Sequence, residues 1–448
     1  MTTTDIATTF ICDLGDGLVL RRSTRADAEK LFEFNALIHS DDPEKPDERI
    51  GQWARDLVEK PHPTFGVGDF TIVEEQATGR FVSSLNHVSQ TWTYDGLPFK
   101  VGRPELVGTL PEFRNRGLVR VQFEEIHKWS AQRGEMVQAI TGIPYYYRLF
   151  GYEMCVDLEG SRSGFEMNLP KLNEGETEPY RFRVATEADI SFLSEISSYG
   201  SRRSLLYALR DEALWRYDLN GRSAKSIQRL VWEIIEQAGT GKSIGFLAHP
   251  EYSWGVSCPV MAYELMEGVS WLEVTSSVVR HMWDVGKTVC ESEGKSRSAF
   301  TFALGSNHPV YEVMRDNLPR QRPPYSWYMR VPDLPVFIRH IAPVLERRLE
   351  ESLIPGFNGE LKLSFYSSGL RLAFESGRLA TVEPWKPDPR NEGDAAFTNL
   401  TFSQVLFGHR SMEELKKSFT DCWWENDRAR IALDTLFPRK ASQFLPIA

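Results

Sequence analysis

The stretch that decides the fold of this chain reads Glu105-Leu-Val-Gly-Thr-Leu-Pro-Glu-Phe-Arg-Asn-Arg-Gly-Leu-Val-Arg120. The pattern predicts a strand that ends at Pro111, a short loop that carries arginines, and a helix that starts near Gly117. Free backbone N–H groups and the positive end of the helix dipole make such a junction an anion site. Because Gly117 has no side chain to block close approach, we interpret the junction as a pyrophosphate cradle. An ordinary strand–helix turn with solvated arginines stays open as the alternative.

Short strands and a helix on either side place this stretch in a mixed sheet. Residues 70–75 predict a strand that turns at Ala77-Thr-Gly79 into a second strand. The hairpin signal Asp95-Gly96 leads into the decisive stretch. The helix that follows ends at Gly134, and residues 136–140 predict one more strand. This order predicts an α+β or mixed α/β fold with a central mixed sheet flanked by helices.

The start of the chain has a partial copy further along. Leu18-Val-Leu-Arg-Arg-Ser-Thr-Arg-Ala-Asp-Ala28 matches Tyr180-Arg-Phe-Arg-Val-Ala-Thr-Glu-Ala-Asp-Ile190 in pattern. Each segment predicts a strand, a capping threonine (Thr24 or Thr186) and a helix start. We interpret the match as an internal duplication, although strand–cap–helix starts are common enough for chance to explain it.

Length and composition predict a multidomain globular protein. At ~150 residues per domain, 448 residues correspond to about three domains. The hydrophobic share of 41% and the charged share of 25% exclude a wholly disordered chain. Two polar, proline-containing joints, at 171–179 and 320–324, divide the chain into units 1–170, 180–330 and 335–448. The last unit alternates apolar residues in strands between helical stripes, which predicts a small α+β domain.

The charge balance and the cysteine pattern limit which classes of partner and metal we expect the chain to bind. With 52 basic and 62 acidic residues the chain carries a net charge of −10, which argues against nucleic acid as a partner and suits a cationic substrate. No run approaches the ~18 apolar residues of a spanning helix, and the first residues lack a secretory pattern. Five scattered cysteines without a CxxC pair argue against disulfides and zinc. We therefore expect a cytoplasmic protein with no membrane insertion and no metal.

Two motifs resemble the GNAT superfamily of N-acetyltransferases. The acetyl-CoA signature of that superfamily is Q/R-x-x-G-x-G/A, and Arg114-Asn-Arg-Gly-Leu-Val119 matches it except that Val119 replaces the usual small residue. Further along, Tyr145-Tyr-Tyr-Arg-Leu-Phe-Gly-Tyr152 resembles the late tyrosine-bearing helix that precedes a phenylalanine-glycine-aromatic turn. Within it, Tyr147 matches the position that the superfamily uses as general acid.

The resemblance implies that acetyl-CoA is the co-substrate. Backbone N–H groups of a splayed strand at 107–109 would bind the pantetheine arm and polarise the acetyl carbonyl. The Tyr147 hydroxyl would protonate the departing thiolate, although a purely structural role for this ring in the aromatic cluster stays open. The implied coenzyme-binding residues are Val107, Gly108, Thr109, Arg114, Asn115, Arg116, Gly117, Leu118, Val119, Arg120, Gly142 and Ile143.

The three-unit arrangement is similar to the Eis (enhanced intracellular survival) type of N-acetyltransferase. That type joins a catalytic GNAT domain, here 1–170, to a degenerate non-catalytic GNAT-like domain, here 180–330. It ends in a sterol-carrier-protein-like domain, here 335–448, and it assembles as a homo-oligomer, which implies a hexamer. In agreement with a degenerate copy, no Arg-x-x-Gly motif occurs in the second unit where the repeat would place it.

The same resemblance implies a general base at the end of the chain. In the Eis type the terminal carboxylate reaches the active site, which here would be the α-carboxylate of Ala448. A base is needed because an alkylamine is almost wholly protonated near neutral pH and cannot attack a thioester. An ordinary chain end is the alternative, and Glu105 or His87 would then be the candidates.

Together these observations predict transfer of an acetyl group from acetyl-CoA to a primary amine through a tetrahedral intermediate. The partner would be a small-molecule or peptide amine of the aminoglycoside, polyamine or lysine kind. Two other classes stay open: a catalytically silent CoA-binding regulatory or assembly protein, and a lipid-binding protein that uses residues 335–448.

Overall fold

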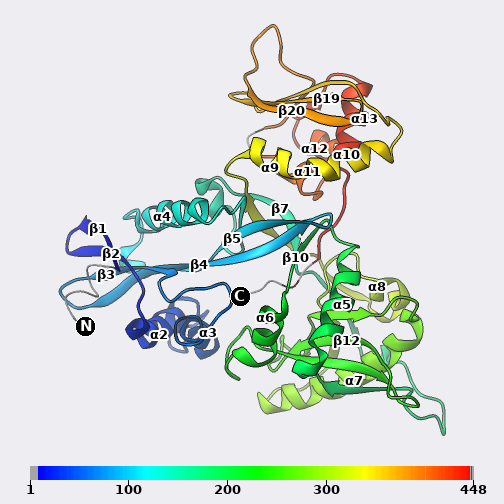
Figure 1. The fold of residues 1–448 in the computed structure, drawn as a ribbon. Helices are drawn as coiled ribbons and strands as arrows, with labels where there is room; N and C mark the ends of the chain where they lie inside the picture. Colours follow the sequence, from blue (N-terminus) through cyan, green and yellow to red (C-terminus); the bar gives the residue numbers. More distant parts are fainter. Residues whose placement is uncertain (1–8, 399, 444, 446–448) are drawn as a thin grey trace.

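The chain has a mixed α/β fold, as predicted, and we describe its sheets and helices as three units. The structure, a computed structural model, describes residues 9–398, 400–443 and 445. Figure 1 shows the first unit in blue and cyan, the second in green, and the third in yellow to red above them.

The first unit is built on one long mixed sheet with helices on both faces. Its strands follow the order β1 (Phe10–Gly15), β2 (Leu18–Arg22), β3 (Phe70–Glu75), β4 (Arg80–Tyr94), β5 (Leu97–Thr109), β6 (Val137–Ile140), β17 (Tyr325–Arg330) and β7 (Glu153–Leu158), and β10 (Leu206–Ala208) pairs with β4. Figure 1 shows α4 on one face and α2 and α3 on the other. The helical segments are η1 (Arg25–Asp27), α2 (Ala28–Ile38), α3 (Glu48–Glu59), η2 (Pro111–Phe113), α4 (Leu118–Gln132), η3 (Tyr146–Phe150) and η4 (Glu166–Asn168).

The second unit divides its strands between two smaller sheets. One sheet has the order β14 (Ala262–Leu265), β12 (Ser243–Pro250), β11 (Leu230–Gln237) and β9 (Tyr180–Val184). The other has the order β13 (Pro259–Val260), β15 (Ala299–Phe302), β8 (Ser161–Phe165) and β16 (Arg320–Arg322). Its helical segments are η5 (Glu187–Asp189), α5 (Ile190–Ser201), α6 (Glu212–Arg216), η6 (Tyr217–Gly221), α7 (Trp271–Ser292), α8 (Val310–Val313) and η7 (Arg315–Asn317).

The third unit is a small sheet covered by helices, as its alternating pattern predicts. The strand order is β20 (Arg378–Trp385), β19 (Gly369–Glu375), β18 (Gly359–Ser364), β21 (Ala395–Ala396) and β22 (Trp423–Trp424). The helices are α9 (Leu334–His340), α10 (Ala342–Glu350), α11 (Phe402–Leu406), α12 (Met412–Ser418) and α13 (Asp427–Leu436).

The first two predicted units exchange strands: the first gives β8 to the second, and the second gives β10 and β17 to the sheet of the first. β8 precedes the predicted boundary at 170–180, yet it lies between β15 and β16 in a sheet of the second unit. Reciprocally, β17 lies between β6 and β7 in the sheet of the first unit. Residues 325–330, predicted to belong to the second unit, therefore form a strand of the first sheet. At these three strands the pairing does not follow the predicted boundaries.

The repeat predicted from the sequence has a structural counterpart in an ion network. Arg21 on β2 donates to both carboxylate oxygens of Asp27, at 2.9 and 2.8 Å, and to Glu74 on β3 at 2.7 Å. The second unit has the same three interactions between β9, η5 and β11, at 2.7 to 2.8 Å, and the residues are Arg183, Asp189 and Glu236. Both strand–helix starts are thus held by the same side-chain chemistry.

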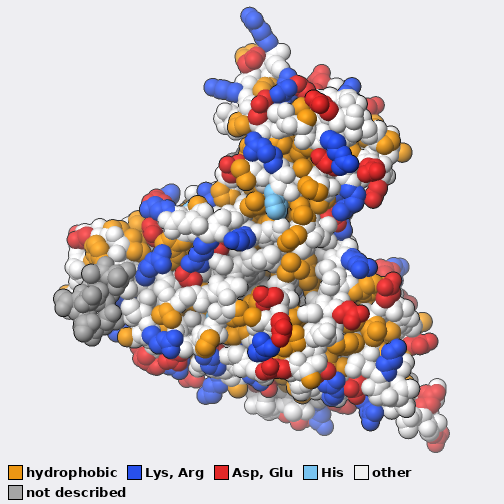
Figure 2. Space-filling model, in the orientation of Figure 1, with side chains coloured by type: hydrophobic (Ala, Val, Ile, Leu, Met, Phe, Trp, Pro, Cys, Tyr) orange, Lys and Arg blue, Asp and Glu red, His pale blue; other side chains and the backbone are white. Residues whose placement is uncertain are grey.

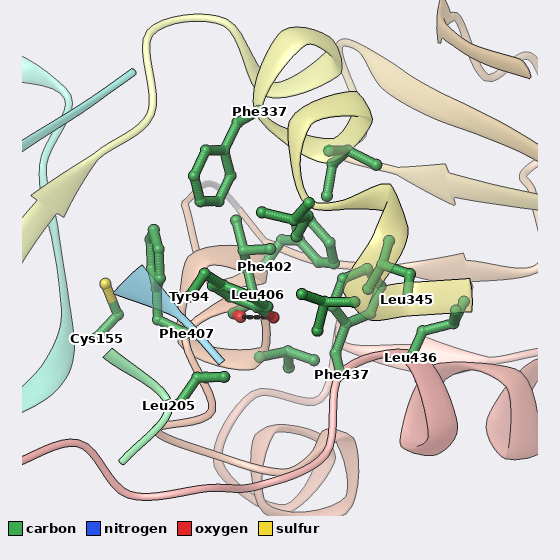
Figure 3. Close-up of a cluster of buried hydrophobic side chains, with 14 of the residues drawn as sticks. Tyr94, Cys155, Leu205, Phe337, Leu345, Phe402, Leu406, Phe407, Leu436 and Phe437 are labelled. Atoms are coloured by element: carbon green, nitrogen blue, oxygen red, sulfur yellow. Dashed lines mark hydrogen bonds between the residues drawn. The ribbon is translucent and has the colours of Figure 1, made fainter. Parts of the chain in front are cut away.

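One shared core attaches the third unit to the other two. Figure 3 shows Tyr94 and Cys155 of the first unit and Leu205 of the second beside Phe337 and Leu406 of the third. Tyr94 is fully buried, and its hydroxyl donates to the carbonyl of Leu406 at 2.8 Å. Because burial of apolar surface is the main force that holds units together, this core fixes the third unit to the sheet of the first.

The surface carries charges of both signs. Figure 2 shows basic and acidic side chains interspersed over all three units on the face turned to the viewer. Within the part of the chain that the structure describes, no helix is long and apolar enough to cross a membrane.

Candidate functional site

A groove opens where two neighbouring strands of the first sheet separate. β5 and β6 pair in parallel at Val101↔Val137 and Gly102↔Gln138. Past these pairs, Leu106 has a φ of 53°, and the β4–β5 register shifts beside it, which are the features of a β-bulge. The separated ends of β5 and β6 then line a groove of about 920 Å³, which also reaches the start of α4.

The end of β5 presents unpaired backbone donors to this groove. The N–H of Leu110 donates to the carbonyl of Val82 on β4 at 2.9 Å. Successive N–H groups of a strand point to opposite sides, so the N–H groups of Thr109 and Val107 are directed away from β4. Gly108 is required between them, because a Cβ atom there would lie 2.7 Å from a side-chain carbon of Ile38 on α2.

The N-terminus of α4 forms the far end of the groove. Gly117 has a φ of 76°, in the left-handed region that glycine tolerates best, and Asn115 before it has a φ of 62°. Among the described residues no side chain caps this helix start. The N–H groups of residues 118–120 therefore face outward with the positive end of the helix dipole behind them. This is the helix start at which the sequence predicts an anion site.

The three predicted arginines do not all face this anion site. Arg114 and Arg120 line the groove. The Arg114 Nε donates to the carbonyl of Thr109 at 3.3 Å, and the Arg120 guanidinium lies 5.6 Å from the Phe150 ring. Arg116 instead pairs with Asp16 at 2.8 Å and does not belong to the groove lining. Its predicted contact with the coenzyme would need it to leave that pair.

Tyr147 lies on η3 and lines the groove beside Gly142. Its side chain is 3% exposed and packs against Phe123 and Tyr328, with ring centroids 5.9 and 5.3 Å away. A Cβ atom on Gly142, whose φ is 118°, would lie 3.7 Å from the Tyr147 hydroxyl. Within the described residues that hydroxyl has no hydrogen-bond partner. Burial, and after it the charge of Glu105, raise the pKa of the phenol well above its ordinary value, so it stays a proton donor.

A second cavity continues from the groove between the first two units. This inner cavity has a volume of about 410 Å³, within the range of small-molecule sites. It shares with the groove the lining residues Trp53, Glu105, Thr141, Ile227 and Gln228. The two cavities are therefore continuous around Glu105.

Glu105 stands at this junction as a buried, paired carboxylate. Its side chain forms an ion pair with Arg103, and both residues are more than nine-tenths buried. Burial raises the pKa of Glu105, and the neighbouring guanidinium opposes that rise. Its position fits a group that takes part in proton transfer between the two cavities.

The end of the described chain enters the same cavity. The N–H of Leu205 donates to the carbonyl of Ala441, and the N–H of Gln443 donates to the Ser204 hydroxyl, both at 3.1 Å. Arg210 donates to the carbonyl of Leu445 at 3.1 Å, and Leu445 lines the inner cavity. Ala448, predicted as the source of the base, lies outside the described residues.

His87 belongs to neither cavity. It is fully buried, and its Nε2 lies 2.7 Å from Glu135, whose other oxygen accepts from the Ser89 hydroxyl at 2.5 Å. His87 is therefore buried inside the first unit, and of the two alternative bases Glu105 is the one that lines the groove and the inner cavity. Among the described residues no group of three or more His, Cys, Asp or Glu side chains is arranged to hold a metal.

Most of the predicted coenzyme residues come together around one groove. Those that line it are Val107, Gly108, Thr109, Arg114, Asn115, Gly117, Leu118, Val119, Arg120, Gly142 and Ile143. The predicted acid Tyr147 and the alternative base Glu105 line the same groove. The walls of the inner cavity were missed from the sequence, among them Trp53, Arg103, Arg210 and Trp327. Their positions are scattered over both units, and no motif links them.

A family comparison covers the first unit. Residues 20–155 match the family described as "Acetyltransferase (GNAT) domain". No curated protein sequence matches the chain.

Solved structures match almost the whole fold. A GCN5-related N-acetyltransferase from Kribbella flavida has a TM-score of 0.65 at 18% identity, over 96% of this chain and 100% of that one. A probable N-acyltransferase from Enterococcus faecalis has a TM-score of 0.63 at 13% identity, with the same coverage. Eis1 from Mycobacterium abscessus has a TM-score of 0.57 at 13% identity, over 96% of this chain and 99% of its own.

These likenesses establish the fold. The chain contains a GNAT acetyltransferase domain, and its mixed α/β fold is that of solved GNAT structures, Eis1 included, as the sequence predicts. The sterol-carrier-like character of the third unit stays a prediction.

Proposed function

We propose that this chain is an N-acetyltransferase that moves an acetyl group from acetyl-CoA to a primary amine. The observation that carries the proposal is the continuity of the two cavities: the groove, with its anion site and its buried phenol, opens into the inner cavity beside Glu105. The GNAT domain match and the GNAT-fold neighbours support acyl transfer in general.

The groove fits the coenzyme in shape and chemistry. Its uncapped helix start offers N–H donors to a diphosphate. The outward N–H groups of Val107 and Thr109 can donate hydrogen bonds to the amide carbonyls of a pantetheine arm and to an acyl oxygen. An extended chain laid along the end of β5 would bring a thioester to the Tyr147 hydroxyl.

Each group then has one role in the reaction. The free amine nitrogen attacks the thioester carbonyl carbon, and the carbonyl oxygen takes up charge in a tetrahedral intermediate. The carbon–sulfur bond breaks, and Tyr147 gives its proton to the leaving thiolate. The proton lost by the nitrogen passes to a base and then, through solvent, restores the phenol. The products are an N-substituted acetamide and the free thiol.

The base in this scheme is the carboxylate of Ala448. The chain leading to it runs along residues 204–210 and reaches the inner cavity at Leu445, which supports this assignment. Glu105 is the alternative, because it lines both cavities.

Two measurements on the purified chain test the proposal. Isothermal titration with acetyl-CoA should give saturable binding, and a free-thiol assay against a panel of primary amines should give amine-dependent thiol release. Tight binding without turnover would favour a silent CoA-binding protein. Absence of binding together with a co-purified lipid would favour a lipid carrier. Sedimentation analysis tests the proposed hexamer, and fractionation of cells tests the cytoplasmic location.

A further inference from the structure

Aromatic rings from both units wall the inner cavity. Trp53 on α3 belongs to the first unit and Trp327 on β17 to its sheet, and Trp232, Tyr252 and Trp254 come from the second unit. Trp53, Trp232 and Trp327 are at most 7% exposed, and the other two are half-buried. Such faces attract flat apolar groups, and they also attract a cation placed over the ring.

Nearly all charged side chains that line this cavity form ion pairs with one another. Its lining holds three arginines and three acids, so the formal charges balance to zero. Arg103 pairs with Glu105. Asp218 is held between two arginines, with Arg210 at 2.7 Å and Arg222 on its other oxygen. The cavity is therefore not the anionic site that the net charge of the chain led us to expect for a polycation.

Glu159 is the exception among these acids. Within the described residues its carboxylate makes no hydrogen bond and no salt bridge. It occupies the turn between β7 and β8 with a φ of 57°, a left-handed conformation that is strained for a residue with a side chain, and Gly160 follows at 91°. Burial raises the pKa of this half-buried carboxylate, and the charge of Arg322 opposes the rise without forming an ion pair. A cation from outside would therefore stabilise its charged form further.

We propose that the inner cavity selects a monoamine with an aromatic body, and that Glu159 binds its ammonium group before transfer. This proposal rests on the proposed function. The rings match the body of such an amine, and one unpaired carboxylate matches one positive charge. A polyamine or an aminoglycoside would bury further ammonium groups. Apart from Glu159 and the Ala448 carboxylate that the scheme assigns to the reacting nitrogen, no free carboxylate in the described lining could neutralise them.

Direct binding tests this selection without relying on turnover. We would titrate the full chain, with CoA bound in the groove, with 2-phenylethylamine and separately with spermidine. The expected result is that 2-phenylethylamine binds at least ~10-fold more tightly than spermidine. Glu159→Gln keeps size and shape but removes the charge, and it should weaken 2-phenylethylamine about tenfold. Glu166→Gln, an exposed glutamate just after β8, is the matched control and should leave the affinity unchanged.

A second variant, outside the strained turn, tests the proposal even if Glu159→Gln fails to fold. Trp254→Leu removes one ring of the cavity wall and should also weaken 2-phenylethylamine, with a melting temperature that confirms folding. Tighter binding of spermidine than of 2-phenylethylamine, or unchanged affinity in both variants, would overturn the proposal.

The outcomes also separate this inference from the proposed function. If polycations are acetylated efficiently, the proposed function survives and the selection of a monoamine fails. If no amine is acetylated while 2-phenylethylamine still binds through Glu159, the selection survives and the proposed function fails.

Discussion

Glu105 and Tyr147 line the same groove, and the charge of the carboxylate adds to burial in raising the pKa of the phenol. This pair lies where the groove meets the inner cavity, because Glu105 lines both. An acid kept protonated beside a site for an incoming amine is what the proposed transfer needs.

Removing the hydroxyl of Tyr147 tests its role as the acid. Tyr147→Phe keeps the ring in its aromatic cluster, so folding and acetyl-CoA affinity should stay near those of the unaltered chain. Turnover should fall ~100-fold or more, the range that general acid catalysis contributes. Stopped assays of thiol release measure this.

Tyr152→Phe is the control for Tyr147→Phe. Tyr152 is fully buried, and its hydroxyl bonds to His127 at 3.0 Å, outside the groove lining. It should lose some thermal stability and keep its turnover. Equal turnover in Tyr147→Phe and the unaltered chain would remove Tyr147 from the chemistry.

The pH dependence of turnover follows from the raised pKa of Tyr147. Turnover at low substrate should rise with pH as the amine loses its proton. A phenol whose pKa lies above the ordinary value of 10.0 stays protonated over that range, so turnover should not fall again below about pH 10. The folded state loses stability as pH rises past that ordinary value, so melting curves must accompany the rates. A descending limb between pH 7 and 9 in stable protein would contradict Tyr147 as the acid.

The two ends of α4 provide a matched pair of glycine variants. Gly117 and Gly134 both have positive φ angles, 76° and 68°, and at neither would a Cβ atom meet protein atoms within 4 Å. Alanine at either position should therefore cost a similar ~1–2 kcal/mol of stability.

Only the first of these variants should affect the coenzyme. In Gly117→Ala the methyl group stands at the helix start that receives the diphosphate, so the Kd for acetyl-CoA should rise ~10-fold or more. Gly134→Ala should leave it unchanged. Calorimetric titration of both variants with acetyl-CoA measures the two Kd values. An equal change in both would mean that the diphosphate binds away from this helix start.

Adding a few glycines after Ala448 tests the proposed base. The chain before it is anchored to residues 204–210 and reaches the inner cavity at Leu445. An extension would displace or bury the terminal carboxylate, so turnover should drop while acetyl-CoA affinity holds. The same glycines at the amino terminus are the control. Full activity of the extended chain would transfer the role to Glu105.

The part of the groove formed by the end of β5 and the start of α4 could be predicted because its residues are neighbours in sequence. A strand end, a loop and a helix start within 105–120 produce an anion site by local geometry alone. The capping threonines Thr24 and Thr186 likewise depend on residues three positions away, and both capping boxes occur.

The exchanged strands and the inner cavity could not be predicted in this way. No strand is predicted from the sequence at β8 or β17. A strand pattern would also not specify the partner, which is set by long-range packing. The cavity is built by side chains such as Trp53, Glu159 and Trp232, which lie on separate elements of two units. Their meeting depends on how the units dock.

The most direct test of the central claim is a crystal structure of the chain grown with acetyl-CoA. We expect the diphosphate on the N–H groups of residues 118–120, the pantetheine arm along residues 107–109, and the thioester sulfur within hydrogen-bonding reach of the Tyr147 hydroxyl. A coenzyme bound with its diphosphate away from α4, or a groove left without it at saturating concentration, would contradict the account.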